Sequence, residues 1–192
     1  VLSFYEEDFE GGVAALFPPD VAWPKLEKLS IYECGGLGAI VRTLAAASWT
    51  SALRELTLDD EGEVVDAEAA ALIASPHLAP LRELYLGGMG MGAAFAKALA
   101  TAPMLASLEE LELRYPTSGV AVVEAIAARE TPKLKKLDLY GEGDLSRNTV
   151  IGLCAKARHP ALESLTLHDF DVSEKVVAEI EKKYPSLKLY VY

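Results

Sequence analysis

A phrase of the form Leu-x-x-Leu-x-Leu recurs along this chain and constrains its fold more than any other feature. Six copies occur in the 192 residues, at 26–31, 53–58, 81–86, 108–113, 134–139 and 162–167, with Ile31 ending the first. Their first residues lie 27, 28, 27, 26 and 28 positions apart. Such a period predicts one small structural unit per copy. Because a single unit cannot bury its own apolar face, the units must stack.

Both ends of the chain extend the pattern. Residues 184–192 align with 159–167, so we expect a C-terminal strand within 185–192 in which Tyr190 and Tyr192 replace the last two leucines. Near the start, Leu2-Ser3-Phe4 matches the end of a partial repeat. We therefore expect a single domain over residues 1–192, with a sheet of about seven to eight strands.

Between the phrases the apolar spacing changes from a period near 2 to one near 3.6, which predicts helices. The expected helices are 37–47, 67–73, 93–100, 120–128, 150–157 and 176–184. Asp66, Ser118, Ser146 and Ser173 stand where N-caps belong. Strands joined through helices are parallel, so the sequence predicts an α/β fold with a parallel sheet.

The registered copies resemble leucine-rich repeat proteins, and their spacing is similar to that of the ribonuclease-inhibitor-like subtype. This resemblance implies an α/β solenoid, a horseshoe-like right-handed superhelix with a concave parallel sheet and α-helices on its convex side. The family usually carries Asn or Cys three residues after the last leucine of each phrase. Cys34 fits, but the other copies have Glu61, Met89, Pro116, Glu142 and Phe170. We therefore expect a divergent member with irregular turns.

Alternation along each strand predicts the side chains of the concave face. In each phrase, three positions are expected to place their side chains on this face, and Tyr115 lies next to them in the sequence. They are Lys28, Glu55, Glu83, Glu110, Lys136 and Ser164; Ser30, Thr57, Tyr85, Glu112, Asp138 and Thr166; and Tyr32, Asp59, Gly87, Arg114, Tyr140 and His168. From these we select a candidate partner-binding surface of Tyr32, Asp59, Tyr85, Glu112, Arg114, Tyr115, Asp138, Tyr140 and His168.

Tyrosine and arginine dominate binding energy at protein interfaces, which favours a protein partner for this surface. Glu112 and Asp138 would form an unfavourable like-charge pair unless Arg114 or a basic ligand neutralises it. A partner carrying Lys or Arg is therefore expected. The alternative is that tyrosine simply suits a strand surface and the charges keep it hydrated.

The excess of acidic residues limits the kinds of partner that this chain can bind. Eighteen Lys and Arg face 29 Asp and Glu, a net charge of −11, which argues against nucleic acid and anionic membranes as partners. No apolar run approaches the roughly 18 residues of a membrane span. Cys34 and Cys154 lie four repeats apart, about 19 Å in a stacked sheet, too far for a disulfide. We expect a monomeric protein of a reducing, cytoplasmic setting.

Four other motifs contain residue types that can carry chemistry. The acidic run 59–63 lacks the ligand spacing of an EF-hand and is better explained as a hydrated turn. The glycine-rich run 86–92 lacks the Lys-Ser/Thr of a phosphate loop and favours a tight convex-side turn. His168 with Asp169, Asp138 and Tyr140 has no accompanying nucleophile. His77 and His159 adjoin prolines and indicate turns. No catalytic residue, metal or cofactor is expected.

Three functions remain open at this point. The leading one is a non-enzymatic module that binds another protein on its concave sheet. The second is a recognition or spacer segment of a larger protein, such as an F-box-type receptor or a bacterial multidomain leucine-rich repeat protein, because the repeat is already interrupted at Val1. The third, by resemblance to acidic proteins of this subtype, is GTPase activation through Arg114, although no family motif maps onto that residue.

Overall fold

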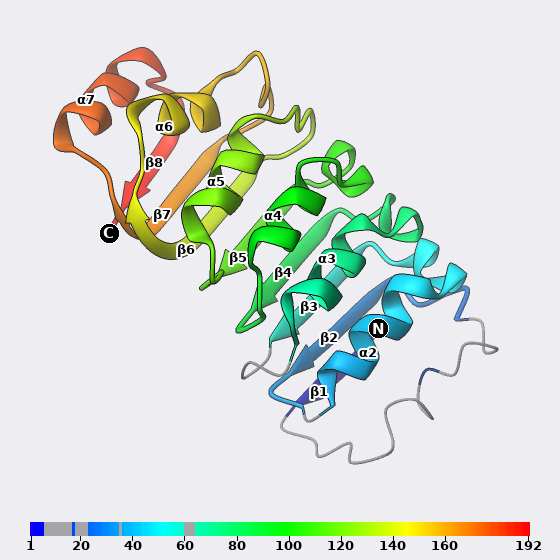
Figure 1. Ribbon diagram of the computed structural model, residues 1–192. Helices are drawn as coiled ribbons and strands as arrows, with labels where there is room; N and C mark the ends of the chain where they lie inside the picture. Colours follow the sequence, from blue (N-terminus) through cyan, green and yellow to red (C-terminus); the bar gives the residue numbers. More distant parts are fainter. Residues whose placement is uncertain (6–16, 18–22, 35, 60–63) are drawn as a thin grey trace.

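The computed structural model describes residues 1–5, 17, 23–34, 36–59 and 64–192. Within them, eight strands form one parallel sheet whose spatial order follows the sequence from β1 to β8 (Figure 1). The strands are β1 Leu2–Tyr5, β2 Lys28–Tyr32, β3 Glu55–Asp59, β4 Glu83–Gly87, β5 Glu110–Arg114, β6 Lys136–Asp144, β7 Ser164–Asp171 and β8 Lys188–Val191. The expected α/β class and parallel sheet are confirmed.

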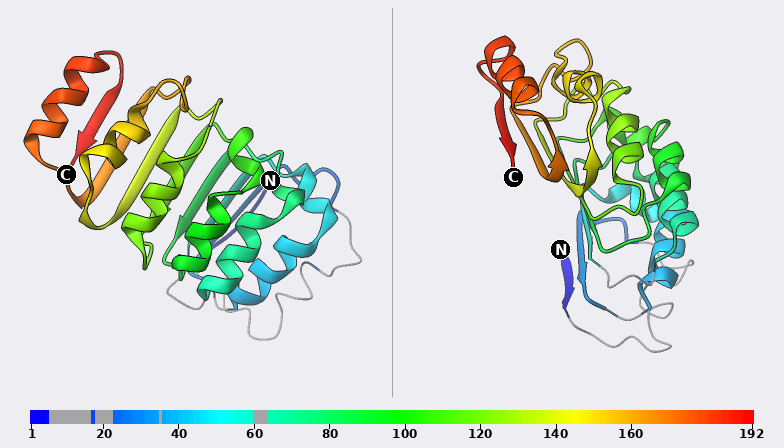
Figure 2. Two further views of the ribbon diagram at one scale, coloured as in Figure 1. Left: turned by 45° about the horizontal axis from the view of Figure 1, so that its top comes forward. Right: turned by 60° about the vertical axis from the view of Figure 1, so that its left-hand side comes forward.

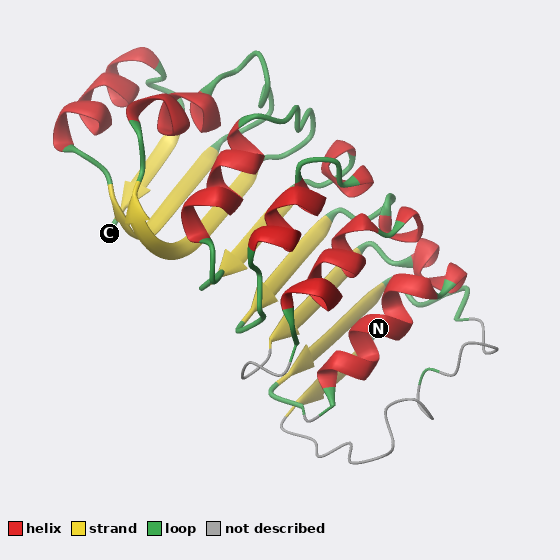
Figure 3. Cartoon of the chain, in the orientation of Figure 1, coloured by secondary structure: helices red, strands yellow, loops and turns green. Residues whose placement is uncertain are grey.

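Six α-helices of the described residues cover one face of this sheet and leave the other face open (Figures 2 and 3). They are α2 Leu37–Ala46, α3 Asp66–Ala74, α4 Ala93–Leu99, α5 Gly119–Ala127, α6 Arg147–Cys154 and α7 Glu174–Lys183, each within three residues of its expected bounds. The sheet curves so that its open face is concave (Figure 2). No helix in the described part of the chain is long and apolar enough to cross a bilayer.

Three short 3₁₀ helices, which the sequence pattern did not predict, return the chain from α2, α3 and α4 to the next strand. They are Ser48–Ala52, Pro76–Leu78 and Pro103–Ala106. Pro76 and Pro103 stand in the first turns of the second and third, where a missing backbone N–H costs nothing. His77 lies in one of these turns, as expected.

The leucines of the phrase form continuous rows across the sheet. Leu84 pairs with Leu111 and Leu86 with Leu113, and the same register runs through all the described strands. The middle and final apolar residues of the six complete phrases are at most 3% exposed. Because each such burial contributes about 1.5–3 kcal/mol, these rows and the helix residues packed on them form the core.

The last strand corrects the expected alignment by one residue. Leu189 pairs with Leu165 and Val191 with Leu167, so these residues continue the apolar rows. Tyr190 instead pairs with Thr166 and lies on the open face. The final phrase is one residue shorter than the others, and a one-residue shift in a strand moves every side chain to the opposite face.

The turns after the strands are more regular than expected. The second residue after the final apolar residue of four phrases has a positive φ, at Glu33, Gly88, Tyr115 and Asp169, the last of which lies within β7. The backbone N–H groups of Glu33, Tyr115 and Asp169 each donate to a carbonyl of the neighbouring repeat, at 3.0 Å.

Different side chains serve the position where Asn or Cys was expected. Cys34 donates to the Tyr32 carbonyl at 3.2 Å, whereas Met89 and Phe170 are buried there and fill the turn with apolar contacts. Glu61 lies outside the described residues.

Of the four expected N-caps, only Ser146 accepts a backbone hydrogen bond at its own helix, from Thr149 at 3.1 Å. Ser118 and Ser173 occupy N-cap positions but make no side-chain capping bond. Asp66 caps the next helix instead, because its carboxylate accepts from the backbone N–H groups of Gly92, Ala94 and Phe95 at 2.8–2.9 Å. This residue therefore ties two successive repeats together.

We expect Asp66→Ala to lower the free energy of unfolding by about 1–2 kcal/mol, because three N–H groups at the start of α4 lose their acceptor. Burial alone would raise the pKa of Asp66, but the three N–H groups hold it below its ordinary value. The contribution is therefore present above about pH 4 and is lost as the pH falls further. Urea unfolding measures both effects. Ser173→Ala is the matched control and should change stability by less than about 0.5 kcal/mol.

One histidine and both cysteines are buried. His159 lies in the turn after α6, as expected, but is only 1% exposed, and its Nδ1 lies 2.6 Å from Thr131 Oγ1. Cys34 and Cys154 are both buried and free, which confirms that they do not form a disulfide. Burial raises the pKa of Cys154 to about 12, so this thiol stays protonated.

His159 gives the fold a second dependence on pH. Burial, with a smaller contribution from Arg158, lowers the pKa of His159 to about 4, whereas an unfolded histidine titrates near 6.5. The unfolded state therefore binds the proton first, and stability should fall by about 2–3 kcal/mol between pH 6.5 and 4. His159→Gln should remove that part of the loss. Unfolding curves that keep the same pH slope in both proteins would contradict this.

Candidate functional site

The open, concave face carries the three predicted columns of side chains in adjacent, registered positions. Tyr85 pairs with Glu112, Glu112 with Asp138, and Arg114 with Tyr140. All nine candidate residues are therefore on or next to this face. They do not form one cluster, because the interactions among them divide the face into parts with different chemistry.

Tyr85 and Asp59 form a hydrogen-bonded pair across Gly87. The Tyr85 hydroxyl donates to Asp59 Oδ2 at 2.9 Å. A Cβ at Gly87 would overlap Asp59 Oδ1 and approach the Tyr85 ring to 3.2 Å. The missing side chain at position 87 therefore lets this pair form. Burial, followed by the bond to Asp59, raises the pKa of Tyr85 well above its usual value, so the hydroxyl stays a donor.

Arg114 is held between two tyrosine rings. Its guanidinium carbon lies 5.1 Å from the centre of the Tyr85 ring and 4.7 Å from that of Tyr140. Its Nε donates to Glu112 Oε1 at 2.7 Å. The charge of Glu112 is thus neutralised along its own strand. Because Arg114 is stacked and paired, it is positioned as part of the surface and not as a free, projecting arginine.

An aromatic ladder continues from Tyr140 toward the C-terminal edge of the sheet. The rings of Tyr140 and His168 stack with centres 3.9 Å apart, and His168 and Tyr192 stack at 4.8 Å. Tyr190 is stacked parallel to Tyr192 at 6.3 Å, and Tyr115 packs against Tyr140 at 6.0 Å. The sequence pattern missed Tyr190 and Tyr192 here because it assigned them to the core. The shortened spacing Leu187-x-Leu189-x-Val191 is the signal that would have found them.

Tyr32 lies apart from this ladder. It stacks on Tyr5 of β1 at 4.8 Å, with ring planes only 4° apart. Gly87 and the Asp59–Tyr85 pair separate it from Arg114 in the same row. The row thus has a small aromatic stack toward β1 and a longer one toward β8.

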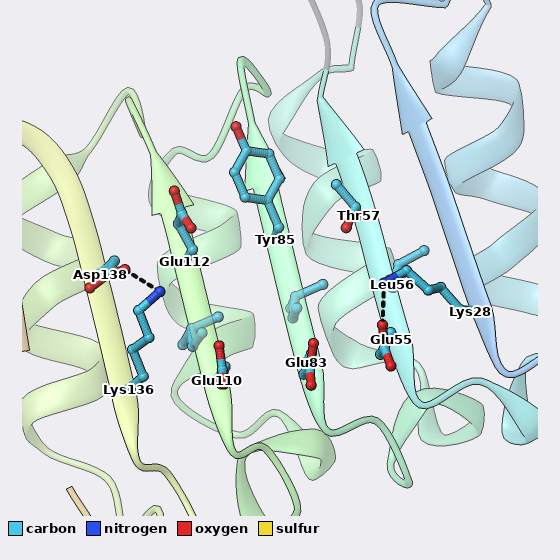
Figure 4. Close-up of a pocket in the computed structure, with 12 residues that line it drawn as sticks. Lys28, Glu55, Leu56, Thr57, Glu83, Tyr85, Glu110, Glu112, Lys136 and Asp138 are labelled. Carbon is cyan, nitrogen blue, oxygen red and sulfur yellow. Dashed lines mark ion pairs between the residues drawn. The ribbon is translucent and has the colours of Figure 1, made fainter. Parts of the chain in front are cut away.

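The first residues of β3, β4 and β5 form an acidic row on the concave face. These residues are not among the nine candidates predicted from the sequence. Glu55, Glu83 and Glu110 stand side by side on β3, β4 and β5 (Figure 4). Glu55 pairs with Lys28 at 2.5 Å, while Asp138 one strand beyond pairs with Lys136 at 2.9 Å. No described cation forms an ion pair with Glu83 or Glu110. Burial, then the charges of Glu55 and Glu110, raise the pKa of Glu83.

This arrangement changes where the unbalanced charge lies. The like-charge pair expected at Glu112 and Asp138 is neutralised by Arg114 and Lys136, respectively. Glu83 and Glu110, on the neighbouring strands β4 and β5, form no ion pair with any described residue. Both line a concavity of about 160 Å³ that also includes Tyr85, Glu112 and Asp138 (Figure 4).

The alternative chemistries find little support in the geometry. The Asp66 carboxylate already occupies the amides at the start of α4, which the glycine-rich run 86–92 would offer to a phosphate. Met89 and Met91 of that run are buried, so it is a packed turn. In the described residues, no group of three His, Cys, Asp or Glu side chains is arranged to hold a metal ion. Residues 60–63 of the acidic run lie outside them.

No protein-family model matches this chain, and no curated protein matches its sequence.

We expect Gly87→Ala to break the Tyr85–Asp59 hydrogen bond and to destabilise the protein by about 1 kcal/mol, because the new methyl group takes the place of the carboxylate. The pKa of Tyr85 should fall toward its ordinary value, as followed by its ring NMR signals. Asp59→Ala should produce the same pKa change. In an Asp59→Ala background, Gly87→Ala should have little further effect. An equal cost in both backgrounds would show that the glycine acts through something other than Asp59.

Proposed function

We propose that this chain is a divergent leucine-rich repeat solenoid that binds another protein on its concave sheet and performs no chemistry itself. The single observation that carries the proposal is the ordered row of aromatic and charged side chains across the one sheet face that no described helix covers. The registered leucine rows support the repeat assignment, because the apolar residues that recur in every phrase form the core. The other residues of the phrase differ from repeat to repeat and lie on the open face.

The composition of the concave face supports a protein partner. Tyrosines and an arginine lie at its centre, and these residue types contribute most to interface energy. Tyr115, Tyr190 and Tyr192 are 59%, 44% and 69% exposed, so a partner could bury much more of their surface. Their rings are already ordered by stacking, which reduces the side-chain entropy lost on association.

The charge of the face supports a basic partner. The whole chain carries a net charge of −11, and on the concave face Glu83 and Glu110 form no ion pair with any described residue. Such a surface speeds the encounter with a positively charged protein and discourages acidic ones. The association should therefore weaken as salt concentration rises.

The test is an affinity measurement with a partner captured from the source organism. We expect the double variant Tyr85→Ala/Tyr140→Ala to weaken binding at least about 30-fold, since two interface tyrosines commonly contribute 2 kcal/mol or more together. The matched control is Glu174→Ala/Glu181→Ala on α7, which should bind like the native protein. If the tyrosine variant folds normally and binds unchanged, the partner does not use the concave face.

A further inference from the structure

We propose that the acidic concavity between β3 and β6 is a specific receptor for an arginine side chain of the partner. This inference rests on the proposed function, because it names the group that the concave face recognises. It begins with two neighbouring carboxylates, Glu83 and Glu110, which form no ion pair in the part of the chain that the structure describes. Lys28 and Lys136 stand at the two ends of the row and leave the centre open (Figure 4).

A second observation, independent of the glutamate row, also points to a missing donor. Asp138 is 9% exposed, and its Oδ2 is paired with Lys136. Its Oδ1 is buried and has no hydrogen-bond partner among the residues that the structure describes. An unsatisfied buried acceptor is unfavourable, so a donor supplied by a ligand would be favoured beside it. Asp138 lines the same concavity as Glu110 and Glu112.

The size and spacing of the site favour a guanidinium over other cations. A volume of about 160 Å³ is below that of pockets for metabolite-sized molecules, and suits one side chain. The carboxylates belong to adjacent strands about 4.8 Å apart and do not converge on one point. A metal ion or a lysine ammonium acts as a point charge, whereas the planar guanidinium fork offers five donors to separated acceptors. Tyr85 forms an apolar wall for the methylene groups.

Lys136 competes with the incoming arginine in this arrangement. Its ammonium neutralises Asp138 from within the chain, at the edge of the concavity. Removing that charge leaves a further carboxylate unpaired and makes the site more attractive to a cation. The proposal therefore predicts a gain of affinity from one substitution as well as losses from others.

The probes are the peptide acetyl-Gly-Arg-Gly-amide and its lysine counterpart, added to the native protein at physiological salt. Binding is followed by NMR through the side-chain carboxyl carbons of Glu83 and Glu110. We expect saturable shifts at both carbons, with the arginine peptide binding at least about threefold more tightly, because bidentate charge-assisted bonds are stronger than single ones.

Three variants and two controls sharpen the experiment. Glu83→Gln and Glu110→Gln should each weaken the arginine peptide about five- to tenfold, while Lys136→Met should tighten it severalfold. Glu174→Gln on α7 and Lys97→Met on α4 make the same chemical changes on the helical side and should have no effect. Equal binding of the two peptides, shifts spread over the whole surface, or no gain from Lys136→Met would overturn the proposal.

The two proposals can fail separately. A captured partner that depends on Tyr85 and Tyr140, together with an arginine peptide that does not bind, would reject the arginine site and leave the concave interface standing. Binding of the arginine peptide, together with a partner indifferent to the concave face, would reject the interface as the function and retain the arginine site.

Discussion

The structure depends on the in-register stacking of leucine side chains between parallel strands. Each phrase places its middle and final apolar residues on one side of a strand, and each strand pairs with the next so that equivalent residues touch. The helices then cover these rows from a single side. One face of the sheet is thus committed to the core, and the opposite face is left to residues that do not have to be apolar.

The same register organises the exposed face. Side chains at equivalent positions stand about 4.8 Å apart, close enough for rings to stack and for charges to act on one another. Tyr140, His168 and Tyr192 form a ladder for this reason. Glu55, Glu83 and Glu110 are brought side by side by the same geometry, at an electrostatic cost that the ion pair of Lys28 with Glu55 offsets at one end of the row. The register of the strands thereby creates both an ordered aromatic surface and an acidic concavity that keeps an excess of negative charge.

Connections between successive repeats add to this register. The Asp66 carboxylate caps the helix of the following repeat, and Thr131 meets His159 in the turn one repeat along. Glu33, Tyr115 and Asp169, which have positive φ, donate backbone hydrogen bonds to the neighbouring repeat. Such contacts couple units that would otherwise touch only through apolar rows, and they make the stability of the array depend on pH through particular groups.

The sequence by itself determined the α/β class, the parallel sheet, the helix positions and the face on which each phrase residue lies, because periods of 2 and 3.6 are local properties. The register of β8 differs by one residue from the alignment with the longer phrase, because the last phrase is one residue short, and its spacing carries that information. The sequence could not show that Arg114 and Lys136 neutralise Glu112 and Asp138 while Glu83 and Glu110 form no ion pair with any described residue. The choice of ion pairs depends on which of several nearby carboxylates a long, flexible arginine or lysine side chain reaches, and only the tertiary structure decides that.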